Sequence, residues 1–421
     1  MIGTIYRHNY EGEKTALKWK GASISYGELD RKVAAYAAYL QTTGLAKGEK
    51  VVLNCINSPE FIYSYLGTVR SGAVIVPINP MLTMEEIIYI VKDSGAKYML
   101  IHPFIITKAN ITKAALEGAL GIHVIVLDEA FKQSITETQE KNSGKTFDFD
   151  GYTDESVVST FLYTSGTTGK QKAAMLSHKN LMTNSDQCYT GLGALPDDIY
   201  MCVLPMFHVF AFTACVLMPL YSGATVVIVE SFQPKEVIET LLQENISIFM
   251  GVPAMYGVLL NAGKKDIHFP KLRRCVSGGA ALPVEIYREA REVMKLPVIE
   301  GYGLTEAAPA CSFNPPLGVQ KELSIGLPLE GIECKIANDN DEELPAGEVG
   351  ELLIRGDNVM LGYWNQSEET EKTLRGGWLH TGDLAKKDED GYIFIVDRKK
   401  DMIVVAGLNV YSREVEEVIY Q

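Results

Sequence analysis

Short apolar runs alternate with longer amphipathic segments along most of the chain. In the first part, the pattern predicts a helix that begins near Ser25 and ends at Gly44, followed by strands and further helices. The predicted strands are 51–55, 74–78, 98–101 and 124–127, and the helices between them are 59–70 and 84–93. Helix-sized segments between short apolar strands indicate parallel crossovers and a sheet covered on both faces.

The alternation resumes in the second part of the chain and then gives way to another pattern. The predicted helices are 180–191, 235–244 and a segment after Pro253, and the strands are 246–250 and 272–277. From Leu323 onwards, short strands with Gly, Pro and Asp turns are typical of a smaller β-rich subdomain. Residues 128–156 are mostly polar, and we expect a mobile, solvent-exposed connection there. The predicted fold class is α/β, with two layered α/β subdomains of mostly parallel sheets and a β-rich subdomain.

One long segment, residues 199–229, contains no Asp, Glu, Lys or Arg and is long enough to cross a membrane. Pro205, His208, Pro219 and a Ser-Gly turn divide it, however, and residues 224–229 have the pattern of a β-strand. We therefore expect a buried helix–turn–strand unit and no integral membrane segment.

Composition narrows the class of protein. The chain has 421 residues, 47% of them hydrophobic, which predicts a globular protein with a sizeable core in two or three packing units. A net charge of −14 argues against nucleic acid as a partner. The seven cysteines are scattered, without a C-x-x-C pair, and residues 1–10 lack the order of a signal peptide. These features favour free thiols and a cytoplasmic location.

The most informative stretch is residues 161–172, where an apolar β-type run leads into a small, flexible loop. Glycines in such a loop allow backbone N–H groups and hydroxyls to converge on an anion, and lysines add positive charge. The spacing does not fit the G-x-x-x-x-G-K-[S/T] pattern of kinases and GTPases, and a plain Ser/Thr/Gly surface loop is the alternative. The candidate phosphate-binding residues are Thr164, Ser165, Gly166, Thr167, Thr168, Gly169, Lys170 and Lys172.

Two further stretches have the composition of a nucleotide site. Gly278, Gly279 and Ala280 follow a predicted strand and are small enough for a flat ring to lie against the backbone. In residues 300–306, an aromatic side chain stands between two glycines, followed by a hydroxyl and a carboxylate. There, Tyr302 can stack on a base, Thr305 can hydrogen-bond a phosphate and Glu306 can hold Mg²⁺, which prefers oxygen ligands. Tight Gly-rich turns are the alternative for both stretches.

Two stretches near the end of the chain complete this set. Asp383 ends residues 377–383 and can accept hydrogen bonds from two vicinal ribose hydroxyls; an Asp turn is the alternative. Residues 392–401 form a predicted strand that runs into a basic cluster. Arg398 can bridge ribose and phosphate there, although such clusters are usually solvated charge runs.

Together, in this order and at these spacings, the stretches resemble the adenylate-forming (AMP-binding) superfamily, in particular its acyl-CoA synthetases and fatty-acid–CoA ligases. The resemblance covers almost the whole chain, from residues 25–29 to 409–417. It implies a two-step reaction, in which a carboxylate and Mg·ATP give an acyl-adenylate and coenzyme A then displaces AMP. It also implies an N-terminal AMP-binding domain at 1–399, with subdomains 1–155, 156–322 and 323–399, and a hinge with the start of a C-terminal domain at 400–421.

The resemblance carries roles onto individual positions. The 164–172 loop would hold the β- and γ-phosphates, with Thr164 and Glu306 near Mg²⁺, and Thr305 would bind the α-phosphate. His208 would lie beside the acyl carboxylate and the thiol tunnel, Lys400 at the hinge and Gly407 near the thiol channel. The implied adenine and ribose set is Gly278, Gly279, Ala280, Glu300, Gly301, Tyr302, Gly303, Asp383, Ile395 and Arg398.

The sequence also departs from the family pattern. Gln171, Ala173 and Ser412 stand where the family often has Pro, Gly and Pro. The chain stops at Gln421, so most of the C-terminal domain, including the lysine that assists adenylate formation, is expected to be absent. If the chain were complete, the first half-reaction would be impaired while binding persisted; if it were a fragment, the parent would be competent.

The acid itself is constrained by charge. Amino-acid-activating members carry an Asp near the helix after His208, whereas residues 209–218 have no charge here. A buried, unpaired ammonium would be costly, so an apolar acid is favoured. Medium- or long-chain fatty acids come first and aromatic acids, coumarate-like, second; a non-catalytic acyl- or nucleotide-binding protein, a luciferase-like oxygenase and a homodimer stay open. The candidate acyl-pocket residues are Phe212, Val252, Met255 and Ala308.

Overall fold

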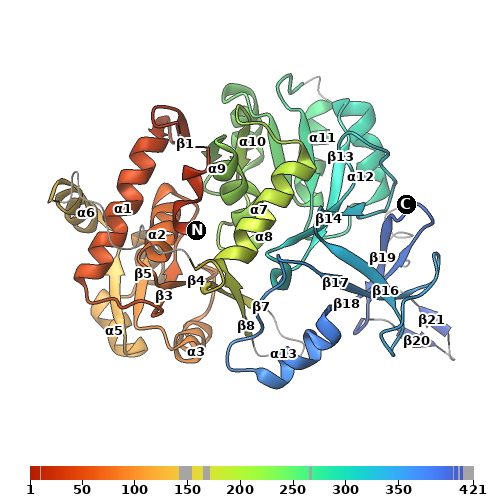
Figure 1. Ribbon diagram of the computed structural model, residues 1–421. Helices are drawn as coiled ribbons and strands as arrows, with labels where there is room; N and C mark the ends of the chain where they lie inside the picture. Colours follow the sequence, from red (N-terminus) through yellow and green to blue (C-terminus); the bar gives the residue numbers. More distant parts are fainter. Residues whose placement is uncertain are drawn as a thin grey trace.

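Three sheets organise the molecule (Figure 1). The computed structural model describes residues 1–9, 11–141, 154–164, 171–264, 268–401, 403–405 and 408–410. Among these residues, the strands form a nine-stranded, a six-stranded and a four-stranded sheet, and a separate two-stranded pair. The α/β class, with mostly parallel sheets and a β-rich part, is therefore confirmed.

The six-stranded sheet has the order β6-β5-β3-β4-β7-β8. Its first five strands in that order are parallel, and β8 closes one edge antiparallel to β7. The strands are β3 (Lys50–Asn54), β4 (Val74–Pro77), β5 (Tyr98–Ile101), β6 (His123–Val126), β7 (Val158–Thr164) and β8 (Lys172–Ser177). Helices connect or flank them. The structure confirms the predicted helices α1 (Tyr26–Thr42), α2 (Pro59–Arg70) and α3 (Met84–Ser94), whereas α4 (Pro103–Ala109) and α5 (Lys113–Leu120), between β5 and β6, were not predicted.

The nine-stranded sheet has the order β15-β14-β13-β12-β11-β9-β10-β1-β2. It is parallel at its centre and antiparallel at both edges. The strands are β1 (Thr15–Trp19), β2 (Ala22–Ser25), β9 (Ile199–Cys202), β10 (Thr225–Ile228), β11 (Ile248–Gly251), β12 (Arg274–Ser277), β13 (Val298–Gly303), β14 (Ala310–Phe313) and β15 (Leu327–Pro328). The two large sheets therefore do not follow the order of the chain. Strands β1 and β2, near its start, lie in the nine-stranded sheet, whereas β7 and β8, which come after residue 155, lie in the six-stranded sheet.

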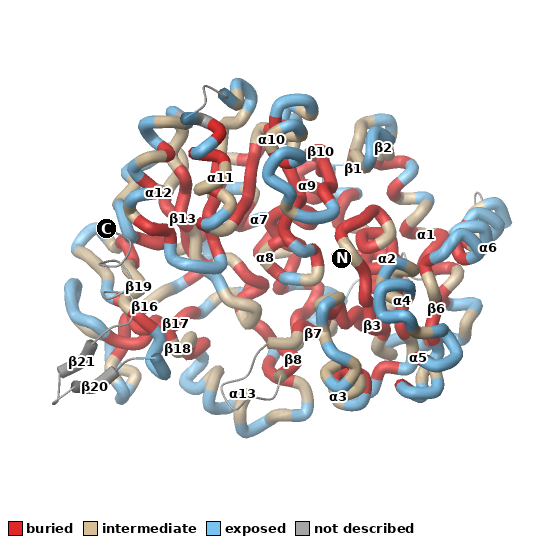
Figure 2. Tube along the Cα trace, turned by 180° about the vertical axis from the view of Figure 1, so that it is seen from behind, coloured by how far each residue is buried: buried red, intermediate tan, exposed pale blue. Residues whose placement is uncertain are grey.

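The two large sheets share an inner core, and each packs other helices on its outer face (Figure 2). Helix α7 (His178–Leu192) and the 209–222 segment contribute to the inner core. The outer face of the nine-stranded sheet packs against α10 (Pro234–Gln243), α11 (Pro253–Gly263) and α12 (Val284–Glu289). Helices α3 and α5 pack on the outer face of the six-stranded sheet. Covered faces explain why the central strands are almost continuously apolar.

The β-rich part is an antiparallel sheet in the order β16-β17-β18-β19. Its strands are β16 (Glu333–Ala337), β17 (Gly350–Arg355), β18 (Leu379–Lys387) and β19 (Ile393–Arg398). Helix α13 (Ser367–Thr373) lies between β17 and β18 in the chain, and β20 (Ile403–Val405) pairs with β21 (Leu408–Val410). The change of pattern predicted near Leu323 is confirmed.

The segment without charges, residues 199–229, is a buried strand–helix–strand unit. Between β9 and β10, the chain forms α8 (Val209–Phe212), a π-helical turn (Thr213–Leu217) and α9 (Met218–Ser222), with Pro219 in the first turn of α9. None of the helices in the described part of the chain combines the length and apolar character needed to cross a membrane. All seven cysteines are free, as predicted.

The prediction for residues 128–156 is wrong in its first half. Helix α6 (Glu129–Lys141) forms there and buries Phe131 and Ile135. The Phe131 ring meets the rings of Tyr36 and Tyr39 edge-on, with centroids 5.2 and 5.1 Å apart. Two apolar residues four positions apart are enough to anchor one helix face, although the remaining residues are polar. Residues 142–153 lie outside the described part of the chain.

A buried histidine at the start of α7 makes stability depend on pH. His178 is 2% exposed, and its Nδ1 accepts a hydrogen bond of 3.3 Å from the backbone N–H of Ile2. Burial, helped by the nearby N-terminal ammonium, lowers the pKa of His178 to about 3. Below about pH 6.5, the usual pKa of histidine, His178 therefore binds a proton in the unfolded chain but stays neutral in the folded protein. The free energy of unfolding falls as a result.

We expect that lowering the pH from 7.5 to 5.5 removes about 1.4 kcal/mol of unfolding free energy through His178 alone. Urea unfolding at the two pH values measures this loss. The His178→Gln variant should lose less stability on acidification, whereas His268→Gln, at an exposed position, should behave as the wild type. Equal losses in His178→Gln and wild type would contradict this origin of the pH dependence.

Candidate active site

A single cavity of about 840 Å³ brings together most of the predicted site residues that the structure describes. Its walls come from both large sheets, the β-rich sheet, α7, α13 and the 208–218 segment. Its charged side chains come from β8, the turn after β13, α13 and the β-rich sheet, which we call the polar end. Its apolar side chains come mainly from α7, the 209–218 segment, β11 and β12, which we call the apolar end. Of the predicted residues, the following border it: Thr164, Lys172, His208, Gly278, Gly279, Gly301, Tyr302, Gly303, Thr305, Glu306, Asp383, Arg398 and Lys400.

Lys172, the first residue of β8, lies at the polar end. It is 6% exposed, and its Nζ donates a hydrogen bond of 2.6 Å to Oε1 of Glu369 on α13. Its ammonium also lies 5.5 Å from the ring centre of Tyr363. An ammonium this deeply buried is stable only beside an anion, and Glu369 supplies it. Residues 165–170, the rest of the predicted phosphate loop, lie outside the described part of the chain.

A short 3₁₀ turn (Thr305–Ala307) after β13 presents Thr305 and Glu306 to the cavity. The hydroxyl of Tyr363 donates a hydrogen bond of 2.7 Å to Oε1 of Glu306. Burial and this carboxylate raise the pKa of Tyr363, so the phenol stays protonated and holds Glu306 in place. The Tyr363 hydroxyl contacts only Oε1 of Glu306, and Thr164, which has a side-chain hydroxyl, lines the same cavity. Such oxygen donors suit Mg²⁺.

The turns after β12 and along β13 are built from small residues because other groups approach them closely. A Cβ on Gly303 would lie 2.2 Å from the carbonyl oxygen of Pro309. A Cβ on Gly278 would lie 3.3 Å from the ring of Phe210. Ala280 does not border the cavity, and neither does Glu300, which is 3% exposed and accepts a hydrogen bond of 3.0 Å from the backbone N–H of Leu282.

Asp383 lies where β18 bulges towards the cavity. Its carboxylate accepts a hydrogen bond from the Tyr302 hydroxyl, and Nε of Arg398 lies 3.3 Å from its other oxygen. Burial raises the pKa of Asp383, and the contacts with Tyr302 and Arg398 oppose this shift. Arg398 and Lys400 also border the cavity, whereas Ile395 packs against the core, and Gly407 lies outside the described residues.

His208 borders the cavity at the start of α8. Its Nδ1 accepts a hydrogen bond of 3.3 Å from the backbone N–H of Phe210, so the ring caps the helix. Desolvation by its surroundings lowers the pKa of His208. The side chain is therefore neutral near pH 7, and its Nε2 is the ring nitrogen not engaged by this capping bond.

The apolar end is not formed by the four predicted pocket residues. Phe212 is buried behind the wall, with its ring centre 4.0 Å from that of Tyr65. Ala308 is buried, and its carbonyl accepts a hydrogen bond of 3.1 Å from the Thr213 hydroxyl. Val252 and Met255 do not border the cavity either. The apolar lining consists of Cys188, Leu192, Val209, Phe210, Ala214, Met218, Met250, Val276 and Phe313.

Several polar residues of the site were not predicted. Tyr363, Glu369, Glu351 and Lys399 all border the cavity. One of them had a visible signal, because Glu351 is a charged residue inside the apolar strand β17, where an uncompensated charge is rare.

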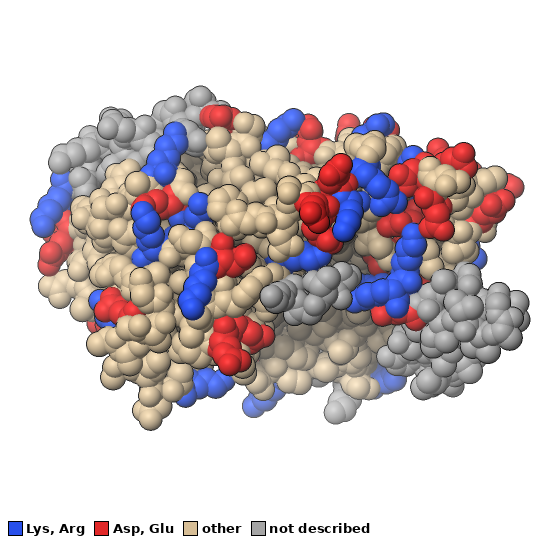
Figure 3. Space-filling view, turned by 90° about the horizontal axis from the view of Figure 1, so that it is seen from below, with Lys and Arg blue, Asp and Glu red and all other residues tan. Residues whose placement is uncertain are grey.

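On the face drawn in Figure 3, Lys and Arg side chains lie among Asp and Glu side chains, without a broad basic area among the coloured residues.

Comparison with known proteins identifies the family of this chain. Residues 7–364 match the family described as AMP-binding enzyme. The long-chain-fatty-acid–CoA ligase of Bacillus subtilis is 31% identical over 97% of this chain and 78% of its own length. The feruloyl-CoA synthase of an Amycolatopsis species is 33% identical over 99% of this chain and 82% of its own.

Solved structures give the same result. ATP-bound MatB from Rhodopseudomonas palustris has a TM-score of 0.89 and 30% identity, covering 99% of this chain and 82% of that protein. The anthranilate CoA ligase AuaEII, in complex with anthranoyl-AMP, has a TM-score of 0.91 and 27% identity, covering 100% and 81%. Ligases of this class use ATP and coenzyme A. The chain belongs to the AMP-binding enzyme family and is an adenylate-forming, AMP-producing acid–CoA ligase.

Proposed function

We propose that this protein activates a medium- or long-chain fatty acid with ATP and transfers the acyl group to coenzyme A. The observation that carries the proposal is the two-ended cavity. Its polar end contains Lys172, Glu306 and Asp383, and its apolar end is lined without a charged side chain. A nucleotide would occupy the polar end and a hydrocarbon tail the apolar end, with the reacting carboxylate between them.

The polar residues suit the chemistry of activation. A carboxylate is a poor electrophile, and forming a mixed anhydride with AMP gives it a good leaving group. Lys172 and Thr305 would stabilise negative charge that develops on the phosphates, and Asp383 with Arg398 would hold the ribose. Glu306 and Thr164 would hold Mg²⁺, which neutralises phosphate charge when bound. Neutral His208, which borders the cavity, would orient the acid carboxylate.

Aromatic acids are the second candidate. Two relatives, a feruloyl-CoA synthase and an anthranilate CoA ligase, are named for aromatic acids. Phe210 and Phe313 in the apolar lining suit an aromatic ring as well as an alkyl chain.

Acid-dependent ATP–pyrophosphate exchange tests the proposal. The acids are octanoate, palmitate, ferulate and anthranilate, with thiol-dependent AMP release followed in parallel. Exchange and AMP release with a fatty acid are the expected result. Exchange with only the aromatic acids would replace the fatty-acid assignment. ATP binding by calorimetry without exchange for any acid would overturn the catalytic proposal in favour of a nucleotide-binding protein.

The Glu306→Gln variant should need about tenfold more Mg²⁺ for half-maximal exchange, because a neutral amide is a weaker Mg²⁺ ligand than a carboxylate. The amide oxygen can still accept the hydrogen bond from Tyr363, so the fold should persist. Titration of exchange activity with Mg²⁺ measures the shift. Glu368→Gln, at an exposed position of α13, is the control and should leave the Mg²⁺ requirement unchanged. A wild-type requirement in Glu306→Gln would remove Glu306 from the metal site.

A further inference from the structure

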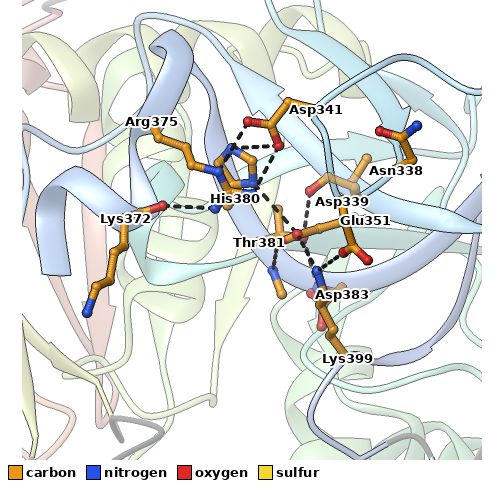
Figure 4. Close-up of polar contacts among 12 residues, drawn as sticks. Asn338, Asp339, Asp341, Glu351, Lys372, Arg375, His380, Thr381, Asp383 and Lys399 are labelled. Carbon is orange, nitrogen blue, oxygen red and sulfur yellow. Dashed lines mark hydrogen bonds and ion pairs between the residues drawn. The ribbon is translucent and has the colours of Figure 1, made fainter.

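Glu351 joins two chain segments at the polar end of the cavity (Figure 4). It lies on β17 and is 9% exposed. Its Oε1 accepts a hydrogen bond of 3.0 Å from the backbone N–H of Gly382, and its Oε2 lies 3.3 Å from Nζ of Lys399. One carboxylate therefore links the bulge of β18 to the end of β19.

The bulge itself needs this support. Residues 381–383 of β18 lie opposite the single residue Leu352 of β17, so the regular ladder is interrupted. Gly382 has a φ of +72°, a conformation that glycine adopts readily and other residues rarely. The backbone N–H of Gly382 is not used in the β-ladder and donates to Glu351 instead. The carbonyl of Gly382 accepts a hydrogen bond of 2.8 Å from the backbone N–H of Lys399. The Gly382 peptide is thus held on both sides.

The residues next to this clamp, which borders the cavity itself, are the two assigned to the ribose. Asp383 follows Gly382, and Arg398 precedes Lys399. Asp383 and Arg398 are register partners across β18 and β19, and their side chains lie 3.3 Å apart. A shift of the Gly382 peptide would move Asp383 away from both Tyr302 and Arg398. Bulges beside active sites commonly serve to aim one side chain in this way.

We propose that Glu351 is a positioning residue for nucleotide binding, which holds Asp383 and Arg398 in place by clamping Gly382 and Lys399. The inference rests on the proposed function, in which Asp383 and Arg398 hold the ribose. Glu351 acts through its neighbours and is not a catalytic residue.

The surrounding charges make a neutral substitution at Glu351 tolerable. Lys399 also contacts Asp339 at 2.8 Å, and Arg375 pairs with Asp341 at 3.0 Å. His380 lies 3.7 Å from Glu351 and 3.8 Å from Asp341, and burial with the nearby Arg375 lowers the pKa of His380. The two cations of this cluster are thus outnumbered by its three carboxylates, and the histidine is neutral. Glu351→Gln removes one of the negative charges and keeps a side-chain oxygen that can accept the hydrogen bond from Gly382.

The test is a double-mutant cycle on ATP affinity in the full chain, measured by calorimetry. The variants are Glu351→Ala, Glu351→Gln, Asp383→Asn and the double variant Glu351→Ala/Asp383→Asn. We expect Glu351→Ala to weaken ATP binding about tenfold and Glu351→Gln about threefold, as for the loss of a charge-assisted hydrogen bond. In the Asp383→Asn background, Glu351→Ala should add less than about twofold, because both changes disturb the same contact.

Glu333→Gln is the matched control, a glutamate on β16 whose ion pair with Arg355 is exposed. It should leave ATP affinity unchanged, and none of the variants should change the KM for the acid by a similar factor. Wild-type ATP affinity in Glu351→Ala, or full additivity with Asp383→Asn, would overturn the inference alone. If Glu351→Ala fails to fold, the threefold effect of Glu351→Gln decides in its place. Absence of ATP binding by the wild type would overturn the proposed function and this inference together.

Discussion

Replacing Lys172 by methionine should lower kcat/KM for acid-dependent ATP–pyrophosphate exchange by about 10² to 10³-fold, the effect of losing one well-placed stabilising group. Lys172 is buried at the polar end of the cavity, where a charge is worth more than in water. Methionine keeps the length and the apolar stem but removes the ammonium. Steady-state exchange kinetics with the preferred acid measure the loss.

Lys179→Met is the control for this prediction. Lys179 is the second residue of α7, and its side chain is 50% exposed and pairs with Asp357. Its replacement should leave exchange within about twofold of the wild type, as expected for a surface ion pair. Wild-type exchange by Lys172→Met would exclude Lys172 from phosphate binding.

The Arg273→Met variant should lose about 3–5 kcal/mol of unfolding free energy, the usual cost of leaving a buried charge without its partner. The side chain of Asp198 is 3% exposed, and it accepts hydrogen bonds from Nε and Nη2 of Arg273, with the Nε bond at 2.7 Å. Ser247 and the backbone N–H of Leu195 donate to the same carboxylate. These remaining donors do not neutralise the charge. Urea denaturation at pH 7.5 measures the loss.

Two comparisons isolate the charge effect. Arg288→Met removes a partner of Glu322 in an exposed ion pair and should cost less than about 1 kcal/mol. The double variant Asp198→Asn/Arg273→Met should recover part of the stability lost in Arg273→Met, since no charge is left buried. A loss below 1 kcal/mol in Arg273→Met would mean that water reaches Asp198 and screens it.

Much of the fold was predictable because its signals are local. The parallel strands of the six-stranded sheet are short apolar runs separated by amphipathic helices, and each begins and ends near its predicted residue. The capping box of Ser25 and Glu28 marks the start of α1 in the sequence itself. The pairing of β1 with β10, more than 200 residues away, has no local signal and was not predicted.

Some residues of the site also have a local signal in the sequence, and others do not. Thr305, Glu306 and Asp383 stand in small-residue turns whose composition is visible in the sequence, and the structure brings them to one cavity. The acyl-pocket prediction included Phe212 because it lies in the uncharged 209–218 segment, but successive helical residues point in different directions. Phe212 turns into the core, whereas Ala214 and Met218, four residues apart, face the cavity, as do Cys188 and Leu192 on α7. Partners such as Glu369 and Tyr363 are brought in by tertiary packing alone.

In the proposed function, the ion pair between Lys172 and Glu369 would make phosphate binding an exchange of anions. A phosphate that reaches Lys172 must displace a carboxylate that is tethered to the same chain and therefore present at a high effective concentration. Weakly held anions such as chloride cannot compete on these terms, whereas a multivalent phosphate with further contacts can. Once displaced, Glu369 would carry an unpaired charge on α13, so occupation of the proposed phosphate site by nucleotide would be passed on to this helix.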